Sequence, residues 1–463
     1  MKNAVLFKLL SLVGVVVLLV FGLGLISGVV RDRQHYRDEA TRSVTQSLAG
    51  SQTLLGPIIH SACVETWDVP TGTGAERTLV EQRREFILTA LPDSLDVQAN
   101  AAMQERARGL HKVNTYALTA KLAARWSNLE SLKPSATQKN SRMNCGAPIV
   151  MLAVDDARGI RTASAVLDGQ SYMLKPGTFF PAYAKGVHAA LPDALRGRAE
   201  ELTANFELEL LGTERLSIVP AGGNTVVQLK SPWPHPSFGG RFLPAERTVT
   251  EQGFEARWRL SALATTAQAD LGQGKPVCGA ENLGGGLGRV ESAATGPAKG
   301  CVDTFSVGFI DPVNAYSLSD RATKYGLLFV ALTFVAVGLF EFMKRLRVHP
   351  VQYLLVGSAL CIFFLLLVSL SEHLPFDVSY AVAASACVLL LTYYASHMLQ
   401  GIWRGLPFGL GIGLLYGLLF TLLQLEQTAL VVGAIALFVV LAAVMVLTRK
   451  VDWYGRLGMK VGE

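Results

Sequence analysis

The chain has 463 residues and a formal net charge of +6, and half of its residues are hydrophobic while only 17% are charged. Soluble domains carry about 25% charged residues, so this composition excludes a disordered or fibrous protein and disfavours a wholly soluble one. The apolar surplus lies in one run near the N-terminus and in a block after Asp320, whereas the long segment between them has ordinary globular composition.

The first apolar run covers residues 9–30 and follows Lys2 and Lys8. A helix of that length exceeds the ~30 Å hydrocarbon core of a bilayer. A cleavable signal peptide would have a shorter apolar region of ~7–15 residues followed by a small-x-small cleavage site. The run therefore predicts an uncleaved signal-anchor helix, and the polar residues up to Ser51 are predicted to continue it.

Short alternating segments bounded by turns begin after Leu54, and they predict an antiparallel β-sandwich or barrel-like sheet. These segments are residues 58–67, 84–89, 202–210, 216–219, 225–229 and 254–260. Leu91-Pro92-Asp93 and Leu191-Pro192-Asp193 each precede a polar stretch and then strand-like sequence. This short repeat suggests two related β-lobes.

Five apolar segments follow Asp320, at residues 325–343, 351–370, 376–396, 407–423 and 428–447. They are apolar on all sides, which is typical of membrane helices and not of a soluble bundle. The predicted fold is a membrane protein with a signal-anchor helix (1–30), a large, mostly antiparallel β domain (31–320), a five-helix transmembrane bundle (321–448) and a short tail (449–463).

The distribution of Lys and Arg predicts the orientation of these spans. Residues 351–403 and 405–448 contain no Lys or Arg, and basic residues gather before, between and after them. Both termini are therefore predicted to be cytoplasmic and residues 31–320 periplasmic. Arg31, Arg33, Arg37 and Arg42 lie on the outer side, but long translocated domains are largely exempt from the rule. The basic charge is thus topogenic, and no basic patch in the middle domain indicates nucleic-acid binding.

Four cysteines fall in the predicted periplasmic domain, where disulfides are expected. Cys278 and Cys301 flank a Gly-rich segment around Gly284 and would close a loop of 22 intervening residues. Such a crosslink is worth roughly 3 kcal/mol by loop-closure entropy, so this pairing is favoured and Cys63–Cys145 follows by elimination. Cys361 and Cys387 lie within spans and are not expected to pair.

Several turn-rich or helix-starting segments carry a resemblance to a known family. They are Asp155-Asp156-Ala157-Arg158-Gly159-Ile160, Ser231-Pro232-Trp233-Pro234-His235-Pro236-Ser237-Phe238, Asp320-Arg321-Ala322-Thr323-Lys324-Tyr325, His349-Pro350-Val351-Gln352-Tyr353, Ser371-Glu372-His373 and Asp452-Trp453-Tyr454. Together they resemble the CreD family of bacterial inner-membrane, cell-envelope integrity proteins. The resemblance implies a Gram-negative inner membrane, a periplasmic middle domain and a link to an envelope regulon, and no established catalytic activity. The four periplasmic cysteines and the Gly-rich insert are not part of the family pattern.

Catalytic and metal-binding motifs are missing from the sequence. It has no His-Glu-x-x-His or Cys-x-x-Cys frame, no Gly-x-Ser-x-Gly elbow and no Walker phosphate loop. His235 between two prolines is a candidate ligand or general base, but a rigid turn with Trp233 packing on the β core explains it without function. Asp155 and Asp156 are candidate paired carboxylates, although such a pair more often marks a turn. No cofactor is predicted.

The charged residues of the membrane block all lie near predicted interfaces. Glu341, Glu372 and His373 are each within about a turn of a span end, where they cost little. Arg321 and Lys324 are predicted interfacial anchors, and Trp453-Tyr454 an aromatic belt element. Gly409, Gly411, Gly413 and Gly417 permit close helix–helix contact or line a groove for lipid.

Three classes of function remain open. The favoured one is a non-enzymatic envelope protein whose periplasmic domain binds an unidentified protein partner or ligand while the helices associate with the lipid bilayer. A transporter or lipid-handling permease would use the C-terminal bundle, but no span has a charge near its middle. A membrane-anchored periplasmic hydrolase would need a nucleophile and base that spacing alone does not reveal.

Overall fold

The computed structural model describes residues 2–71, 78–108, 111–278, 300–309, 315–344, 348–398, 401–425 and 429–449. The chain divides into two compact units. The helical unit consists of Met1–Tyr36 with Val313–Glu463, and the β unit consists of Arg37–Pro312. The boundary falls inside the first helix, α1 (Lys2–Ser47), so one continuous helix belongs to both units.

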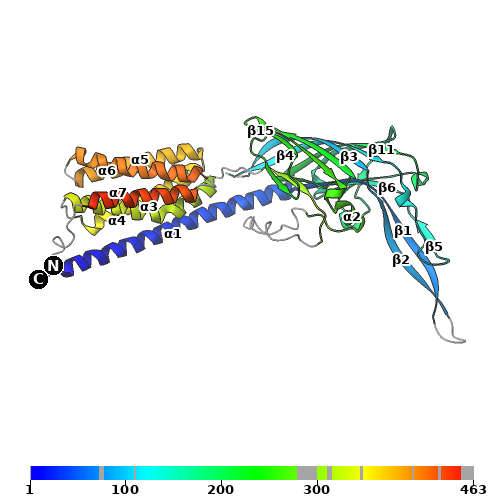
Figure 1. Ribbon diagram of the computed structural model, residues 1–463, viewed down its shortest axis with the longest axis horizontal. Helices are drawn as coiled ribbons and strands as arrows, with labels where there is room; N and C mark the ends of the chain where they lie inside the picture. The colour runs from blue at the N-terminus through cyan, green and yellow to red at the C-terminus, as the bar shows by residue number, and fades with distance from the viewer. Residues whose placement is uncertain are drawn as a thin grey trace. The chain divides into compact units, whose positions relative to one another are not determined.

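The helical unit is a bundle of apolar helices, whose members α3 to α7 lie side by side in Figure 1. Besides part of α1, its described residues form α3 (Ala315–Lys344), α4 (Pro350–Ser371), α5 (Phe376–Met398), α6 (Ile402–Gln424) and α7 (Ala429–Thr448). Within it α3 packs against α4 and α6, α4 against α5, and α5 against α6. The N-terminal apolar helix and the apolar bundle predicted from the sequence are both present.

Five helices in the described chain are long and apolar enough to cross a membrane. They are Leu10–Ser47, Ser317–Gly338, Pro350–Ser371, Phe376–Met398 and Gly405–Gln424, and α7 carries a shorter apolar stretch, Val431–Val446. Helix α4 shows the pattern of a bundle helix in lipid: Leu360, Phe363 and Leu367 are buried, whereas Leu355 and Ile362 are exposed. One apolar face therefore packs on neighbouring helices and the other is available to hydrocarbon.

The described residues of the β unit form two sheets. The first has the order β14-β17-β12-β1-β6-β10-β9, with β2 and β5 also pairing with β1, and the second has the order β15-β16-β13-β3-β4-β11-β7-β8. Their bounds are β1 (Gln52–Thr71), β2 (Thr78–Ala90), β3 (Ser94–Arg108), β4 (His111–Trp126), β5 (Arg142–Cys145), β6 (Ile149–Val154), β7 (Ile160–Leu167), β8 (Gln170–Tyr172), β9 (Lys175–Pro176), β10 (Gly186–Ala190), β11 (Leu202–Thr213), β12 (Arg215–Ile218), β13 (Asn224–Ser231), β14 (Ser237–Gly240), β15 (Glu246–Thr250), β16 (Gly253–Ser261) and β17 (Phe305–Gly308).

Most neighbouring strands are antiparallel, as the alternating segments predict. Among the named strands of the described residues two pairs are parallel: β1 with β12, where Leu54 lies opposite Ile218, and β3 with β13, where Val97 lies opposite Val227. A parallel pair needs a long crossover connection. Each of these pairs therefore joins segments that are far apart along the chain.

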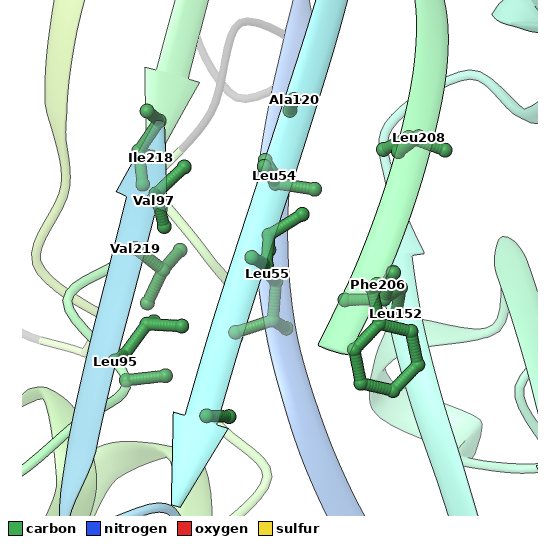
Figure 2. Packing of buried hydrophobic residues seen from close by; sticks show 14 of the residues in the cluster. Leu54, Leu55, Leu95, Val97, Ala120, Leu152, Phe206, Leu208, Ile218 and Val219 are labelled. Atoms are coloured by element: carbon green, nitrogen blue, oxygen red, sulfur yellow. The ribbon is translucent and has the colours of Figure 1, made fainter. Parts of the chain in front are cut away.

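One hydrophobic core fills the space between the two sheets. Leu54 and Leu152 come from the first sheet, and Val97, Phe206 and Leu208 come from the second (Figure 2). Along β11 every second residue is buried, as expected for a strand with one face on the core. Each fully buried side chain of this size contributes about 1.5–3 kcal/mol.

The two Leu-Pro-Asp segments, which suggested related lobes, have different local structures. Asp93 directly precedes β3, whereas Asp193 begins a 3₁₀ turn, Asp193–Leu195. Both sheets contribute to the same core. The architecture is therefore a two-sheet sandwich with a shared interior.

A long hairpin, formed by β1 and β2, projects from the sandwich as an arm (Figure 1). Its strands stay paired from Ile59–Ala90 out to Thr71–Thr78, while β5 accompanies β1 only as far as Thr66. Beyond that point the arm is a two-stranded ribbon. Ribbons of this kind are marginal in water unless other contacts hold them.

A buried carboxylate fastens the loop before β5 to this arm. Glu65 is 0% exposed and accepts hydrogen bonds from Thr137 N (2.7 Å), Thr137 Oγ1 (2.6 Å), Gln138 N (3.1 Å) and Ser141 Oγ (2.8 Å). Arg84 Nη1 lies 3.7 Å from it. The Thr137 hydroxyl bond, followed by the other donors, lowers the pKa of Glu65 to about 2 despite its burial.

Two disulfides close the described β unit, in the pairing that loop spacing favours. Cys63 and Cys145 lie directly opposite each other on β1 and β5, with their Cα atoms 4.1 Å apart. Cys278 and Cys301 are also bonded, with a Cα–Cα distance of 5.2 Å. The Gly-rich insert around Gly284 lies outside the described residues. Cys361 and Cys387 are buried free thiols of the helical unit.

Candidate functional site

The C-terminal turns of α1 are bound into the β unit. Ala40 and Val44 are buried there. Thr45 Oγ1 lies 3.5 Å from Thr213 Oγ1, and Thr213 also donates its hydroxyl to Ala49 O (3.2 Å). The end of the anchor helix is therefore part of the β unit's packing.

The Asp-Asp-Ala-Arg segment forms a clamp on this helix end. Arg158 donates through Nη1 to Gln46 O (2.5 Å), in the last turn of α1. Its Nε and Nη2 donate to the two carboxylate oxygens of Asp156, at 2.9 and 2.6 Å, the fork geometry that suits Arg and carboxylate. The Arg158 side chain is the main reason that the pKa of Asp156 lies below its usual range. Asp156 also accepts from Gly50 N (3.3 Å), just beyond the helix.

The buried side-chain amide of Gln52 also belongs to this clamp. Gln52 is fully buried, donates to Asp156 O (3.0 Å) and Leu211 O (2.9 Å), and accepts from Asp156 N (3.1 Å). Gly159 lies so close that a Cβ there would be 2.3 Å from Leu211 O and 2.5 Å from Gln52 Nε2. Asp155 points elsewhere and accepts from Thr53 Oγ1 (2.6 Å). The two aspartates therefore accept hydrogen bonds from different partners, Asp155 from Thr53 and Asp156 from Arg158, and do not act as a carboxylate pair.

Within the helical unit, α1 is held by close packing. A Cβ on Gly357 of α4 would lie 2.2 Å from the Leu19 side chain, and one on Gly326 of α3 would lie 3.0 Å from Leu23. Leu19 and Leu23 are buried in this bundle. The two leucines thus occupy space that is open because Gly357 and Gly326, which face them, have no side chain.

An ion pair fixes α1 at the end of α4. Arg33 Nε lies 3.2 Å from Glu372 Oε1, and the Glu372 side chain is nearly buried. His373 lies in the turn between α4 and α5, where its backbone N–H bonds Leu370 O (3.0 Å). The predicted motif residue Glu372 is therefore paired with Arg33, one of the arginines that conflict locally with the predicted orientation.

The His-Pro-Val-Gln-Tyr motif starts α4. His349 is the N-cap: its Nδ1 accepts from Val351 N (3.3 Å) and its own N–H donates to Gln352 Oε1 (2.9 Å), with Pro350 at the first helical position. Tyr353 OH then donates to Glu341 Oε2 of α3 (2.9 Å). The motif both begins the helix and ties it to its neighbour.

The Trp-Pro-His-Pro segment forms a turn closed on itself. Trp233 Nε1 donates to His235 O (2.9 Å), and the Trp233 ring packs on the core while the His235 side chain is exposed. Pro234 and Pro236 fix the backbone on either side. The hydrogen bond uses the His235 backbone carbonyl, and the imidazole lies edge-on to the Trp233 ring with 6.5 Å between the centroids.

The remaining motif residues have simpler positions. Arg321 and Lys324 lie in α3, where Lys324 pairs with Asp320 (2.7 Å) one turn before it. Asp452, Trp453 and Tyr454 lie outside the described residues. In the described chain no three His, Cys, Asp or Glu side chains gather closely enough to hold a metal ion. The motif residues in the described chain hold helix ends and turns in place. Those that contact α1, Arg158 and Glu372, form the candidate functional site.

Comparisons with known proteins show which family the chain resembles. The family model for the inner membrane protein CreD matches residues 4–454. The inner membrane protein CreD of Escherichia coli (strain K12) is 37% identical over 458 residues, which cover 98% of this chain and 95% of that protein. Among solved structures, an M1 zinc metallopeptidase from Deinococcus radiodurans has 11% identity, covers 47% of this chain and 41% of its own, and has a TM-score of 0.21, which is too low to support a conclusion on fold or activity.

Proposed function

The chain belongs to the CreD family of inner membrane proteins, and from this premise we propose that it is a non-enzymatic protein that contributes to the integrity of a Gram-negative cell envelope. In this proposal the β unit lies in the periplasm and binds a protein partner or ligand. The helical unit lies in the bilayer, and α1 couples the two. Residues 1–30 and 321–448 span the membrane, 31–320 are periplasmic, and 449–463 form a cytoplasmic tail.

The attachment of α1 is the observation that carries this proposal. One part of the helix is held in the helical unit by Leu19, Leu23 and the Arg33–Glu372 pair. Another part of the same helix is clamped in the β unit by Arg158. In this proposal α1 transmits a change of load between its two attachments, as the helix of a sensor or mechanical link would.

The arm of the β unit is the proposed partner contact. Val69 and Val80 lie opposite each other near its end, and Pro70 lies opposite Leu79. Val69, Leu79 and Val80 are exposed. Val69 and Val80 share one face of the ribbon, and Pro70 and Leu79 share the other, because successive strand residues alternate between faces. Exposed apolar groups on a projecting element suit a contact surface. A photocrosslinker at Leu79 should capture a specific partner in cells, while one at Val249, an exposed valine of edge strand β15, should not.

An insertion in α1 tests the coupling. Placing Gly-Gly-Ser after Tyr36 breaks the helix between its two attachments, because glycine is a poor helix former. In a strain that lacks the protein, this variant should insert and form both disulfides but fail to restore resistance to an envelope-disrupting detergent. The same insertion after Gly284 is the matched control and should restore it. Full rescue by the Tyr36 insertion would contradict the coupling role.

A further inference from the structure

Two buried histidines hold one loop of the β unit by its backbone. His60 of β1 is 1% exposed, and its Nε2 lies 2.9 Å from Thr178 O. His188 of β10 is 6% exposed, and its Nδ1 lies 2.8 Å from Gly177 O. In both bonds the ring nitrogen must donate, since a carbonyl oxygen only accepts. The two carbonyls belong to consecutive residues, so both imidazoles anchor the same point.

The anchored loop has a conformation that its own residues disfavour. Phe179 has a φ of +56°, in the left-handed region that bulky residues rarely occupy. It is 69% exposed, with its ring edge-on to His188 at 4.6 Å between centroids, whereas Phe180 is buried against His60 at 5.2 Å. Such a backbone persists only where surrounding contacts hold it. Weakening the two imidazole contacts would therefore let the loop relax.

The second nitrogen of His60 makes protonation costly in the closed loop. His60 Nδ1 is buried without a hydrogen-bond partner. In the neutral ring this atom carries a lone pair, but in the charged ring it carries an N–H that finds no acceptor. Burial is the main reason that the pKa of His60 lies below 6.5; the bond to Thr178 opposes this, and the nearby His188 adds to it.

The surrounding elements offer no free counter-charge among the described residues. Lys175 of β9 lies beside His188 in the ladder and is itself a cation. Tyr183, stacked on Phe180, donates its hydroxyl to Lys275 O (2.6 Å). Asp270 of helix α2 (Ala267–Gly272) is bound by Lys275 Nζ at 2.6 Å and by Thr266 Oγ1 at 2.7 Å. Strand β6 contributes only the apolar Ile149–Val154, and Thr89 of β2 lies opposite His60.

We propose that the loop Gly177–Tyr183 is a latch that acid releases, with His60 as its sensing residue and His188 as a second anchor of the loop. Above the ordinary histidine pKa the His60 ring is neutral and the loop is closed. Because the folded-state pKa of His60 is lowered, the open state binds more protons, so the stability of the closed loop is lost as the pH falls below about 6.5. The latch concerns the β unit alone and does not depend on the proposed envelope role.

Hydrogen–deuterium exchange on the full-length protein in lipid nanodiscs tests the latch. After correction for intrinsic rates, the amides of residues 177–180 and 182–184 should lose protection by about tenfold between about pH 8 and about pH 5, on either side of the histidine pKa. The amides of β11 serve as an internal reference and should not change. His60→Gln keeps an N–H donor for Thr178 O but cannot become charged, so its loop should stay protected at both pH values. His235→Gln, which removes an exposed histidine, should retain the wild-type response.

Two results would overturn the latch: wild-type loop protection that does not depend on pH, or an unchanged acid response in His60→Gln. If His60→Gln does not fold, NMR of isotope-labelled histidine side chains in the wild-type protein decides the matter. The His60 ring and the loop must then change with the same midpoint. Titration of His60 without opening of the loop would equally refute the proposal.

Discussion

Glu65 illustrates how one side chain can determine whether a projecting element is ordered. Its four hydrogen-bond donors come from three residues of one loop. The carboxylate therefore joins the arm to the loop before β5 through hydrogen bonds. Buried charge of this kind is stable only because every oxygen is satisfied.

Glu65→Gln should lower the urea midpoint of the β unit at neutral pH, because an amide supplies one acceptor oxygen where the carboxylate supplies two. The folded pKa of about 2 lies below the unfolded value of 4.5. The carboxylate's contribution is thus complete above pH 4.5 and is lost as the pH falls toward 2. Urea titrations across this range should show the gap between wild type and variant closing. Glu207→Gln, at an exposed surface pair, is the control; a gap that is constant with pH would disprove the assignment.

At the scale of elements, glycines decide how closely neighbours approach. The clamp on α1 depends on Gly159, and Gly159→Ala should destabilise the β unit by about 1–3 kcal/mol, the usual cost of overpacking. Its Cβ would meet the Leu211 carbonyl, which is backbone and cannot swing aside. Gly272→Ala is the matched control, since its Cβ would make only an ordinary contact, 3.9 Å from Thr89 Oγ1. Equal unfolding midpoints for the two variants would show that the clamp tolerates a methyl group.

The glycines of helix α6 also differ in how much space surrounds them. A Cβ on Gly409 would lie 2.0 Å from Thr392 Oγ1 of α5, whereas one on Gly413, a turn further on, would have nothing within 4 Å. Gly409→Leu should therefore weaken the α5–α6 contact and lower the thermal unfolding midpoint in detergent, with a cost of about 1–3 kcal/mol. Gly413→Leu should leave it near wild type. A larger loss at Gly413 would mean that its open face is covered in the folded protein.

At the scale of the whole molecule, the testable property is membrane topology. The long stretches without Lys or Arg, bracketed by basic residues, predict six spans with both ends in the cytoplasm. A reporter that works only in the periplasm should be inactive when fused after Glu463 and active when inserted at Gly285. An active C-terminal fusion would require an odd number of spans.

The sequence predicted the large features because each had a strong local signal. The apolar helices and six of the strands (β1, β2, β11, β12, β13 and β16) were identified, but the other strands were missed, among them the long pair β3 and β4. Their core-facing positions include Ala99, Ala101, Ala120 and Ala124, and alanine hides the alternation that reveals a strand. The clamp was also invisible: Arg158 and Gln46 are 112 residues apart. The segment that contains Arg158 was recognised as a turn. Its contact with the end of α1 arises only when the chain folds.

The place of β1 within its sheet also constrains the order in which the unit can assemble. This strand, the first of the β unit to be synthesised, pairs in parallel with β12, and β12 pairs in turn with β17, the last strand. Contacts between segments so distant in sequence form slowly, because a long loop must close before they bring any gain. The first sheet is incomplete until Phe305–Gly308 has been made, when nearly two thirds of the chain already exists. During much of its synthesis the nascent chain therefore has unpaired strand edges in the first sheet. A chaperone that binds unfolded segments would be most useful in this period.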